Sequence, residues 1–118
     1  MRLTVIIGSK ETYDAAIPAP ETGIEGQACY DYYIEQLKTA EGSCVDFQSV
    51  PKQDPPSKSF FLMGVVETAI MDYLRQHESP EQVRIICTDP EVARLYKVVY
   101  NFNFAVSKAD RMMEDDWH

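Results

Sequence analysis

The chain has 118 residues, 45% of them hydrophobic, and its 19 acidic residues against 11 basic ones give a formal charge of −8. This length matches one globular domain over 1–118, and the acidic surplus argues against a nucleic-acid partner because phosphate backbones attract basic surfaces. No apolar run approaches the ~20 residues that cross a bilayer, so we expect a soluble, cytoplasmic protein with no membrane partner.

The first predicted element is a buried strand over 3–7, with the sequence LTVII, followed by a polar turn from Gly8 to Thr12. The stretch 12–21 contains two prolines and little periodicity, which predicts a long loop and a candidate lid. The pattern Thr22-Gly23-Ile24-Glu25 then resembles a capping box, and apolar residues at helical spacing follow it. A first helix is therefore expected to end near Gly42.

A second strand is predicted over 44–50, where apolar and polar residues alternate as they do in an edge strand half open to water. The stretch 51–58 is a loop by composition, and Ser57 or Ser59 is the candidate cap of a helix over about 60–77. The first turns of this helix, FFLMGVV, are apolar all round. Its predicted buried stripe comprises Leu62, Val66, Ala69, Ile70, Tyr73 and Leu74.

The stretch 82–100, QVRIICTDPEVARLYKVVY, predicts a strand and the helix that follows it. The apolar run of Val83, Ile85, Ile86 and Cys87 is typical of a central parallel strand that is covered on both faces. Thr88 and Asp89 can accept hydrogen bonds from the first amides of a helix, and Pro90 suits its first turn. A third helix is therefore expected over about 90–101. A short terminal helix starting at 107–110 and an acidic tail at about 113–118 complete the chain.

The alternation of strands and helices predicts an α/β domain: a small three-layer sandwich with a mainly parallel sheet of three strands, Rossmann-like in form. We expect the strand order 2-1-3, with the first and third strands as neighbours and the alternating strand outside them. Ligands of open parallel sheets bind outside the carboxyl ends of the strands, where the strand order reverses. The predicted site is therefore a crevice between Gly8–Thr12 and Thr88–Glu91.

The predicted ligand-binding residues of this crevice are Gly8, Ser9, Lys10, Thr88 and Asp89. The first three offer a flexible backbone, a hydroxyl and a cation, which a phosphate accepts. Neither phosphate fingerprint, GxxxxGK[ST] or GxGxxG, is present, so a turn without a ligand is the alternative. The carboxylate of Asp89 would repel a phosphate and suits a ribose hydroxyl or an adenine amine, with helix capping as the alternative role.

No catalytic residue, metal site or cofactor is predicted. His77 and His118 stand at element ends without neighbours that would make a general base or a ligand set. Cys29, Cys44 and Cys87 have no CxxC spacing, which predicts free thiols. An enzyme that uses the loop 12–21 as a lid stays an alternative without a named nucleophile.

From about Gly64 to Tyr100 the chain resembles the carboxyl-terminal part of macro domains, where a helix like GVVETAIMDYL leads to a stretch like QVRIICTDPEVARLYK. The resemblance covers about a third of the chain and implies a reduced macro-like fold, with Thr88, Asp89 and Pro90 near the adenosine end of an ADP-ribose pocket. Macro domains also carry an asparagine in an early loop and a glycine-rich phosphate loop, whereas residues 51–61 here read PKQDPPSKSFF. The hydrolase residues of that family therefore have no counterpart.

Two functions are expected from these observations. The first is a domain that binds a nucleotide-type, ADP-ribose-like ligand at the crevice without catalysis. The second is an acidic protein-interaction or self-associating module with no small-molecule ligand. Tyr32, Phe102 and Phe104 fall off the main helical stripes, and they would form an interface for a second copy if they were exposed together.

Overall fold

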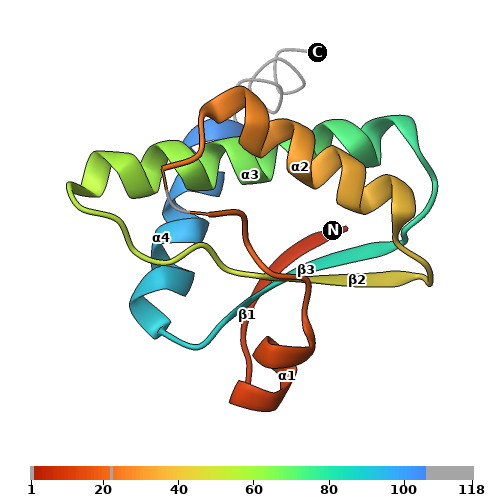
Figure 1. Ribbon diagram of the computed structural model, residues 1–118, viewed down its shortest axis with the longest axis horizontal. Helices are drawn as coiled ribbons and strands as arrows, with labels where there is room; N and C mark the ends of the chain where they lie inside the picture. Colours follow the sequence, from red (N-terminus) through yellow and green to blue (C-terminus); the bar gives the residue numbers. More distant parts are fainter. Residues whose placement is uncertain (1, 22, 106–118) are drawn as a thin grey trace, which may run out of the picture.

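The computed structural model describes residues 2–21 and 23–105 as one α/β domain (Figure 1). The short terminal helix and the acidic tail that the sequence predicts lie outside these residues. The elements in chain order are β1 (Leu3–Ile7), α1 (Lys10–Ala15), α2 (Gly26–Thr39), β2 (Cys44–Gln48), α3 (Pro56–Gln76), β3 (Gln82–Cys87), α4 (Pro90–Tyr100) and the π-helical turn η1 (Asn101–Ala105).

The sheet has three parallel strands in the order β1-β3-β2. The α/β class and the parallel sheet are confirmed, as are the pairing of the first strand with the third and the outer position of the second. The middle strand is β3, whereas the order 2-1-3 counted along the chain gives that position to the first strand. Burial explains the difference, because Ile85 and Ile86 are fully buried on opposite faces of β3 while Ile7 of β1 is 58% exposed.

Three helices cover one face of the sheet and enclose the main core. Tyr33 of α2 packs its ring at 5.0 Å from that of Phe47 on β2, and α3 packs between α2 and α4. The buried side chains of α4 include Tyr96, whose hydroxyl accepts a hydrogen bond from the amide of Val50 at 2.8 Å. The core therefore lies between the sheet and the layer of α2, α3 and α4 (Figure 1).

The opposite face of the sheet carries a thinner layer. Of the described helices only α1 lies there, with Thr12 close to Ile86 at the carboxyl end of the strands. Polar side chains of β2 and β3 also lie on this face, where Arg84 forms two hydrogen bonds to Asp46, at 2.7 and 2.6 Å. These bonds are the main reason that the pKa of Asp46 is lowered.

The segment predicted as a turn and a long loop instead contains the helix α1. Ser9 caps this helix, because its hydroxyl accepts a hydrogen bond from the amide of Thr12 at 3.2 Å. The helix has only six residues, too few to show a hydrophobic period in the sequence. After it, Ile17 pairs with β2 and exchanges backbone hydrogen bonds with Asp46 and Gln48 at 2.9 and 2.8 Å.

The start of α3 also differs from the prediction. The helix begins at Pro56, four residues earlier than expected, and Pro suits the first turn because it has no amide hydrogen to leave unpaired. Neither predicted serine caps it: Ser59 is buried within the helix, where its hydroxyl contacts the backbone of Gln53. The predicted buried stripe is confirmed except for Tyr73, which is half-buried.

The helix α2 begins at Gly26, after Glu25, whose side chain makes no capping hydrogen bond. Thr22 of the predicted capping box lies outside the described residues. The helix α4 starts as the sequence predicts, since the carboxylate of Asp89 accepts a hydrogen bond from the amide of Glu91 at 2.9 Å.

Candidate functional site

The predicted crevice lies where β1 and β3 end side by side. The amide of Gly8 donates a hydrogen bond to the carbonyl of Cys87 at 2.9 Å, which joins the two loops at their start. From this point β1 leads to α1 on one face of the sheet, and β3 leads to α4 on the other. The two loops therefore diverge at a topological switch point, as the sequence analysis expects.

Two of the predicted ligand residues in this crevice already have structural roles. A Cβ atom on Gly8 would lie 2.8 Å from Cγ2 of Ile86, so glycine is required for close packing rather than for an open phosphate loop. The hydroxyl of Ser9 caps α1 and lies 3.0 Å from the hydroxyl of Thr12. Gly8 and Ser9 therefore serve the packing and the capping of this segment rather than a ligand-binding loop.

The other predicted residues are exposed at the same edge. Lys10 and Thr88 are exposed, and Asp89 is exposed although its carboxylate caps α4. Glu91 forms an ion pair with Lys52 at 2.6 Å, and both side chains are about half exposed. The crevice thus offers one ammonium and one hydroxyl for a ligand, while its carboxylates stabilise the start of α4.

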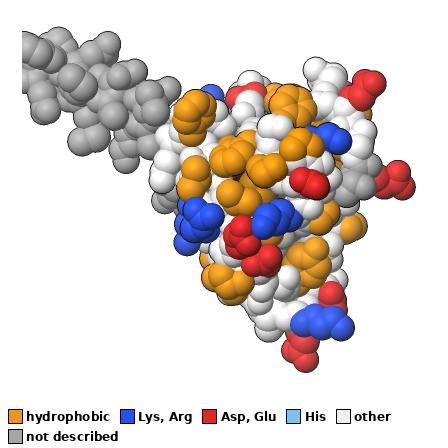
Figure 2. Space-filling model, turned by 90° about the vertical axis from the view of Figure 1, so that its left-hand side faces the viewer, with side chains coloured by type: hydrophobic (Ala, Val, Ile, Leu, Met, Phe, Trp, Pro, Cys, Tyr) orange, Lys and Arg blue, Asp and Glu red, His pale blue; other side chains and the backbone are white. Residues whose placement is uncertain are grey.

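A second feature is an exposed group of large apolar side chains, which we call the aromatic surface. It comprises Phe60 and Phe61 at the start of α3, Val98 on α4 and Phe102 in η1, which are 41%, 59%, 41% and 77% exposed. Figure 2 looks onto the side of the molecule where α3 begins and α4 runs, and shows hydrophobic side chains gathered there beside charged groups of both signs. Exposed apolar clusters of this kind often mark interaction sites.

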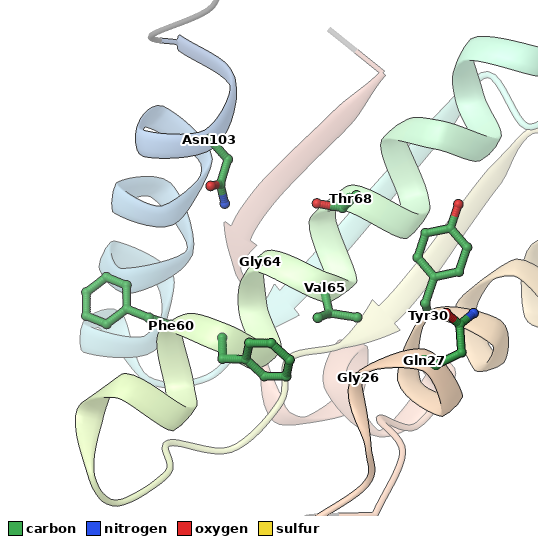
Figure 3. Close-up of a pocket in the computed structure, with 9 residues that line it drawn as sticks. Gly26, Gln27, Tyr30, Phe60, Gly64, Val65, Thr68 and Asn103 are labelled. Carbon is green, nitrogen blue, oxygen red and sulfur yellow. The ribbon is translucent and has the colours of Figure 1, made fainter.

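The aromatic surface contains two hollows with uncharged linings. The larger, of about 520 Å³, lies between the start of α2, the first half of α3 and η1 (Figure 3). Its lining comprises Gly26, Gln27, Tyr30, Phe60, Phe61, Gly64, Val65, Thr68 and Asn103. The second, of about 420 Å³, is lined by Phe60, Phe61, Val98, Val99, Phe102 and Asn103.

Glycine residues shape the larger hollow. A Cβ atom on Gly26 would lie 2.9 Å from Cζ of Phe61, so the exposed phenyl ring lies directly against the start of α2. At Gly64, a Cβ atom would lie 3.4 Å from the side-chain nitrogen of Asn103. In Figure 3, Asn103 and Tyr30 stand on opposite sides of α3, with Gly64 between them. The absence of side chains at both glycines leaves room between three elements.

The sequence predicts only part of this surface. Of the residues considered as an interface, Phe102 is exposed, but Tyr32 is half-buried away from it, with its hydroxyl bonded to the carbonyl of Pro18 at 2.5 Å. The side chain of Phe104 lies outside the described part of the structure. Sequence reasoning missed Phe60 and Phe61, although the all-apolar start of their helix was the available signal: a helix packed on one side leaves some of those residues exposed.

A buried carboxyl group lies apart from both surfaces. Glu67 of α3 is fully buried, and neither carboxyl oxygen has a hydrogen-bond partner among the described residues. Burial raises its pKa from 4.5 to about 8, so the side chain is mostly protonated at neutral pH. The hydroxyl of Tyr33 is likewise buried without a partner, and burial raises its pKa.

Within residues 2–21 and 23–105, no three His, Cys, Asp or Glu side chains gather as a metal site. Cys29 and Cys87 are buried free thiols, and burial raises the pKa of Cys87 to about 11. His77 contacts the carbonyl of Tyr73 at 2.9 Å and stacks on its ring. No helix in the described part of the chain is both long and apolar enough to span a membrane.

No protein-family model matches this chain, and no curated protein shows significant similarity to it.

Proposed function

We propose that this domain is a protein-interaction module whose aromatic surface packs against a second copy of the chain. The observation that carries the proposal is the exposure of Phe60, Phe61 and Phe102 around two hollows without a charged lining residue. Aromatic side chains are enriched at interfaces, and the centres of interfaces are depleted of charged residues.

The charge of the chain favours this surface over the rest of the molecule. Each copy carries a formal charge of −8, so two copies repel one another wherever their acidic side chains meet. Contact through an uncharged region keeps these groups at the rim, where water and salt screen them. Self-association should therefore strengthen as the ionic strength rises.

The shape of the surface suits a twofold interface. In such an interface the same patch contacts itself, so the patch must hold both a projecting group and a matching hollow. Among the described large apolar side chains Phe102 is the most exposed, and the hollow that Gly26 and Gly64 shape lies beside Phe61. Full burial of an exposed Phe side chain contributes about 1.5–3 kcal/mol, so the six partly exposed rings of a symmetric pair supply a share of the binding free energy.

The test is the molar mass in solution, measured by light scattering after size-exclusion chromatography at micromolar and higher concentrations. We expect a mass that approaches twice the 13.5 kDa of one chain as the concentration rises. The substitution Phe61→Ser should shift the equilibrium to monomer. A monomer at every concentration for the unsubstituted chain would contradict the proposal.

Ile7→Ser is a matched control. Ile7 is 58% exposed and Phe61 is 59% exposed, so the two substitutions remove apolar side chains of similar exposure. Ile7 lies at the end of β1 and lines neither hollow. Ile7→Ser should leave the dimer intact, and equal loss from both variants would show that general surface hydrophobicity drives association.

A second candidate function is the binding of a nucleotide-type ligand, such as ADP-ribose, at the crevice of Gly8, Ser9, Lys10, Thr88 and Asp89. The adjacency of the loops after β1 and β3 supports it, as does the macro-domain resemblance of Gly64–Tyr100. Thermal-shift titration with ADP-ribose, ATP and NAD tests it, because a ligand at 100 times its Kd stabilises by about 2.7 kcal/mol. The shift should weaken in Lys10→Glu, and no shift with any of the three would exclude this function.

A further inference from the structure

The outer edge of β1 is an unpaired edge of the sheet. β1 stands at one end of the strand order, and the Gly8 amide is directed inward to the carbonyl of Cys87. Backbone groups alternate in direction along a strand, so the even-numbered residues face β3. Leu3, Val5 and Ile7 therefore direct their N–H and C=O groups outward, and no strand of residues 2–21 and 23–105 pairs with them.

The opposite edge of the same sheet is closed. Ile17 lies beside β2 as a single paired residue, with backbone hydrogen bonds to Asp46 and Gln48. Natural proteins protect a free edge with charged residues, prolines or bulges, and β1, with the sequence LTVII, contains no charged residue or proline. The two edges thus differ, and within the described part of the chain only that of β1 presents an apolar strand open to pairing.

A hollow accompanies this open edge. It has a volume of about 360 Å³ and lies between β1 and the end of α4. Its lining comprises Leu3, Thr4, Val5, Lys97, Tyr100 and Asn101. A groove between an edge strand and a helix is the setting in which extended peptides add a strand to a sheet, with main-chain hydrogen bonds for affinity and side-chain pockets for specificity.

We infer that the edge of β1 binds an extended peptide segment of a partner protein, which adds to the sheet as a fourth strand. Alternate side chains of such a segment point to opposite faces, so apolar ones enter the hollow and polar ones face water. Lys97 is the one charged residue among those that line the hollow, so an acidic side chain of the peptide fits beside it. This site is separate from the aromatic surface proposed for self-association.

The probe is a fluorescein-labelled heptapeptide, Thr-Val-Thr-Val-Thr-Val-Asp, titrated with the full chain in a fluorescence-anisotropy assay. We expect saturable binding that is lost when the amides of both the threonines and the valines are N-methylated, because such a peptide keeps its side chains but cannot donate to the strand edge in either direction. Amide exchange measured by NMR should slow at Val5 and Ile7 on binding. Exchange at Thr4 and Ile6 should already be slow, since their amides face β3.

Two charge reversals on α4 provide a matched pair. Lys97→Glu should weaken binding about threefold to fivefold, as expected for loss of one exposed ion pair. Arg94→Glu makes the same charge change on the same helix at an exposed residue that does not line the hollow, and it should have no effect. Equal effects of both variants would assign the binding to net charge and overturn the inference.

Other outcomes would also overturn it. Binding that survives N-methylation, or exchange protection confined to residues outside β1, would place the peptide elsewhere. Protection of Val5 and Ile7 in the peptide-free dimer, abolished by dilution to monomer, would assign the edge to a second copy of β1. The absence of peptide binding at millimolar concentration would reject the site outright. The peptide-binding results do not depend on whether the aromatic surface forms a dimer, because they can be measured on Phe61→Ser, which lacks that contact.

Discussion

Replacement of Glu67 by Gln should change the pH dependence of stability more than any other single substitution in the described core. The carboxyl group of Glu67 is fully buried in α3 and has no hydrogen-bond partner among residues 2–21 and 23–105. Glutamine has nearly the same shape but no proton to gain or lose. Glu67→Gln therefore removes the titration while it preserves the packing around the side chain.

The size of the effect follows from the rise of the Glu67 pKa. The pKa of the folded state is about 8 against 4.5 for an exposed glutamate, and each pKa unit corresponds to 1.36 kcal/mol. Between these values the folded state holds a proton that the unfolded state has lost. Glu67 by itself therefore favours the native state most below pH 4.5, and its contribution to stability decreases by about 5 kcal/mol in total as the pH rises through about 8.

The assay is urea unfolding followed by circular dichroism at several pH values from 5 to 10, for both proteins. We expect the free energy of unfolding of Glu67→Gln, relative to the unsubstituted chain, to increase with pH by about 1.36 kcal/mol per pH unit. The increase should level off above about pH 8, after a total gain of about 4 kcal/mol from pH 5. Any pH-independent offset reports the cost of burying the amide instead.

Glu35→Gln is the matched control, because Glu35 is an exposed glutamate on α2. Its difference from the unsubstituted chain should be flat over the same range. A flat difference for Glu67→Gln as well would refute the reasoning, since it would show that Glu67 is ionised in the folded protein. A gain that continues to rise well above pH 9 would instead show that the folded pKa is higher than about 8.

Three further substitutions test the fold around the crevice and the open face of the sheet. Gly8→Ala should cost about 1–3 kcal/mol in urea unfolding, because its Cβ would meet Ile86 at 2.8 Å, and an unchanged midpoint would show that β1 can shift freely. Asp89→Ala should cost about 1 kcal/mol by loss of the α4 cap, and no loss would free Asp89 for a ligand role. Asp46→Asn should cost up to about 1 kcal/mol at neutral pH, since the pair with Arg84 is partly exposed. Because its folded pKa is lowered below 3.8, this contribution should persist above pH 4 and disappear as the pH falls through the folded value; a pH-independent difference would contradict it.

Features that depend on neighbours along the chain were predictable from the sequence. The apolar run of β3 and the start of α4 at Asp89 and Pro90 agree with their predictions. Strand burial and helix capping depend on residue types within a few positions, so a local pattern is enough to predict them. The alternating pattern of β2 likewise identified an outer strand. Ser59 shows the limit of such patterns, since a serine near a helix start resembles a cap whether or not its hydroxyl reaches the first amides.

One part of the candidate site was also predictable from the sequence, and another part was not. The approach of the loops after β1 and β3 was predictable, because carboxyl ends of neighbouring parallel strands share one edge of the sheet. The aromatic surface was not, since Phe60 and Leu62 are equally apolar and only the placement of α2 and α4 decides which is covered. The same holds for Glu67, an acidic residue that a sequence would assign to solvent.

The sequence by itself determined the α/β class, the three parallel strands and the helix that follows β3, because these depend on periodicity and on capping over a few residues. Only the tertiary structure decided which strands flank β3, that no described residue pairs with the outer edge of β1 and that Phe61 lies exposed against Gly26. The physical reason is that an apolar pattern specifies which side of an element avoids water, whereas packing between distant elements decides how much of that side is covered.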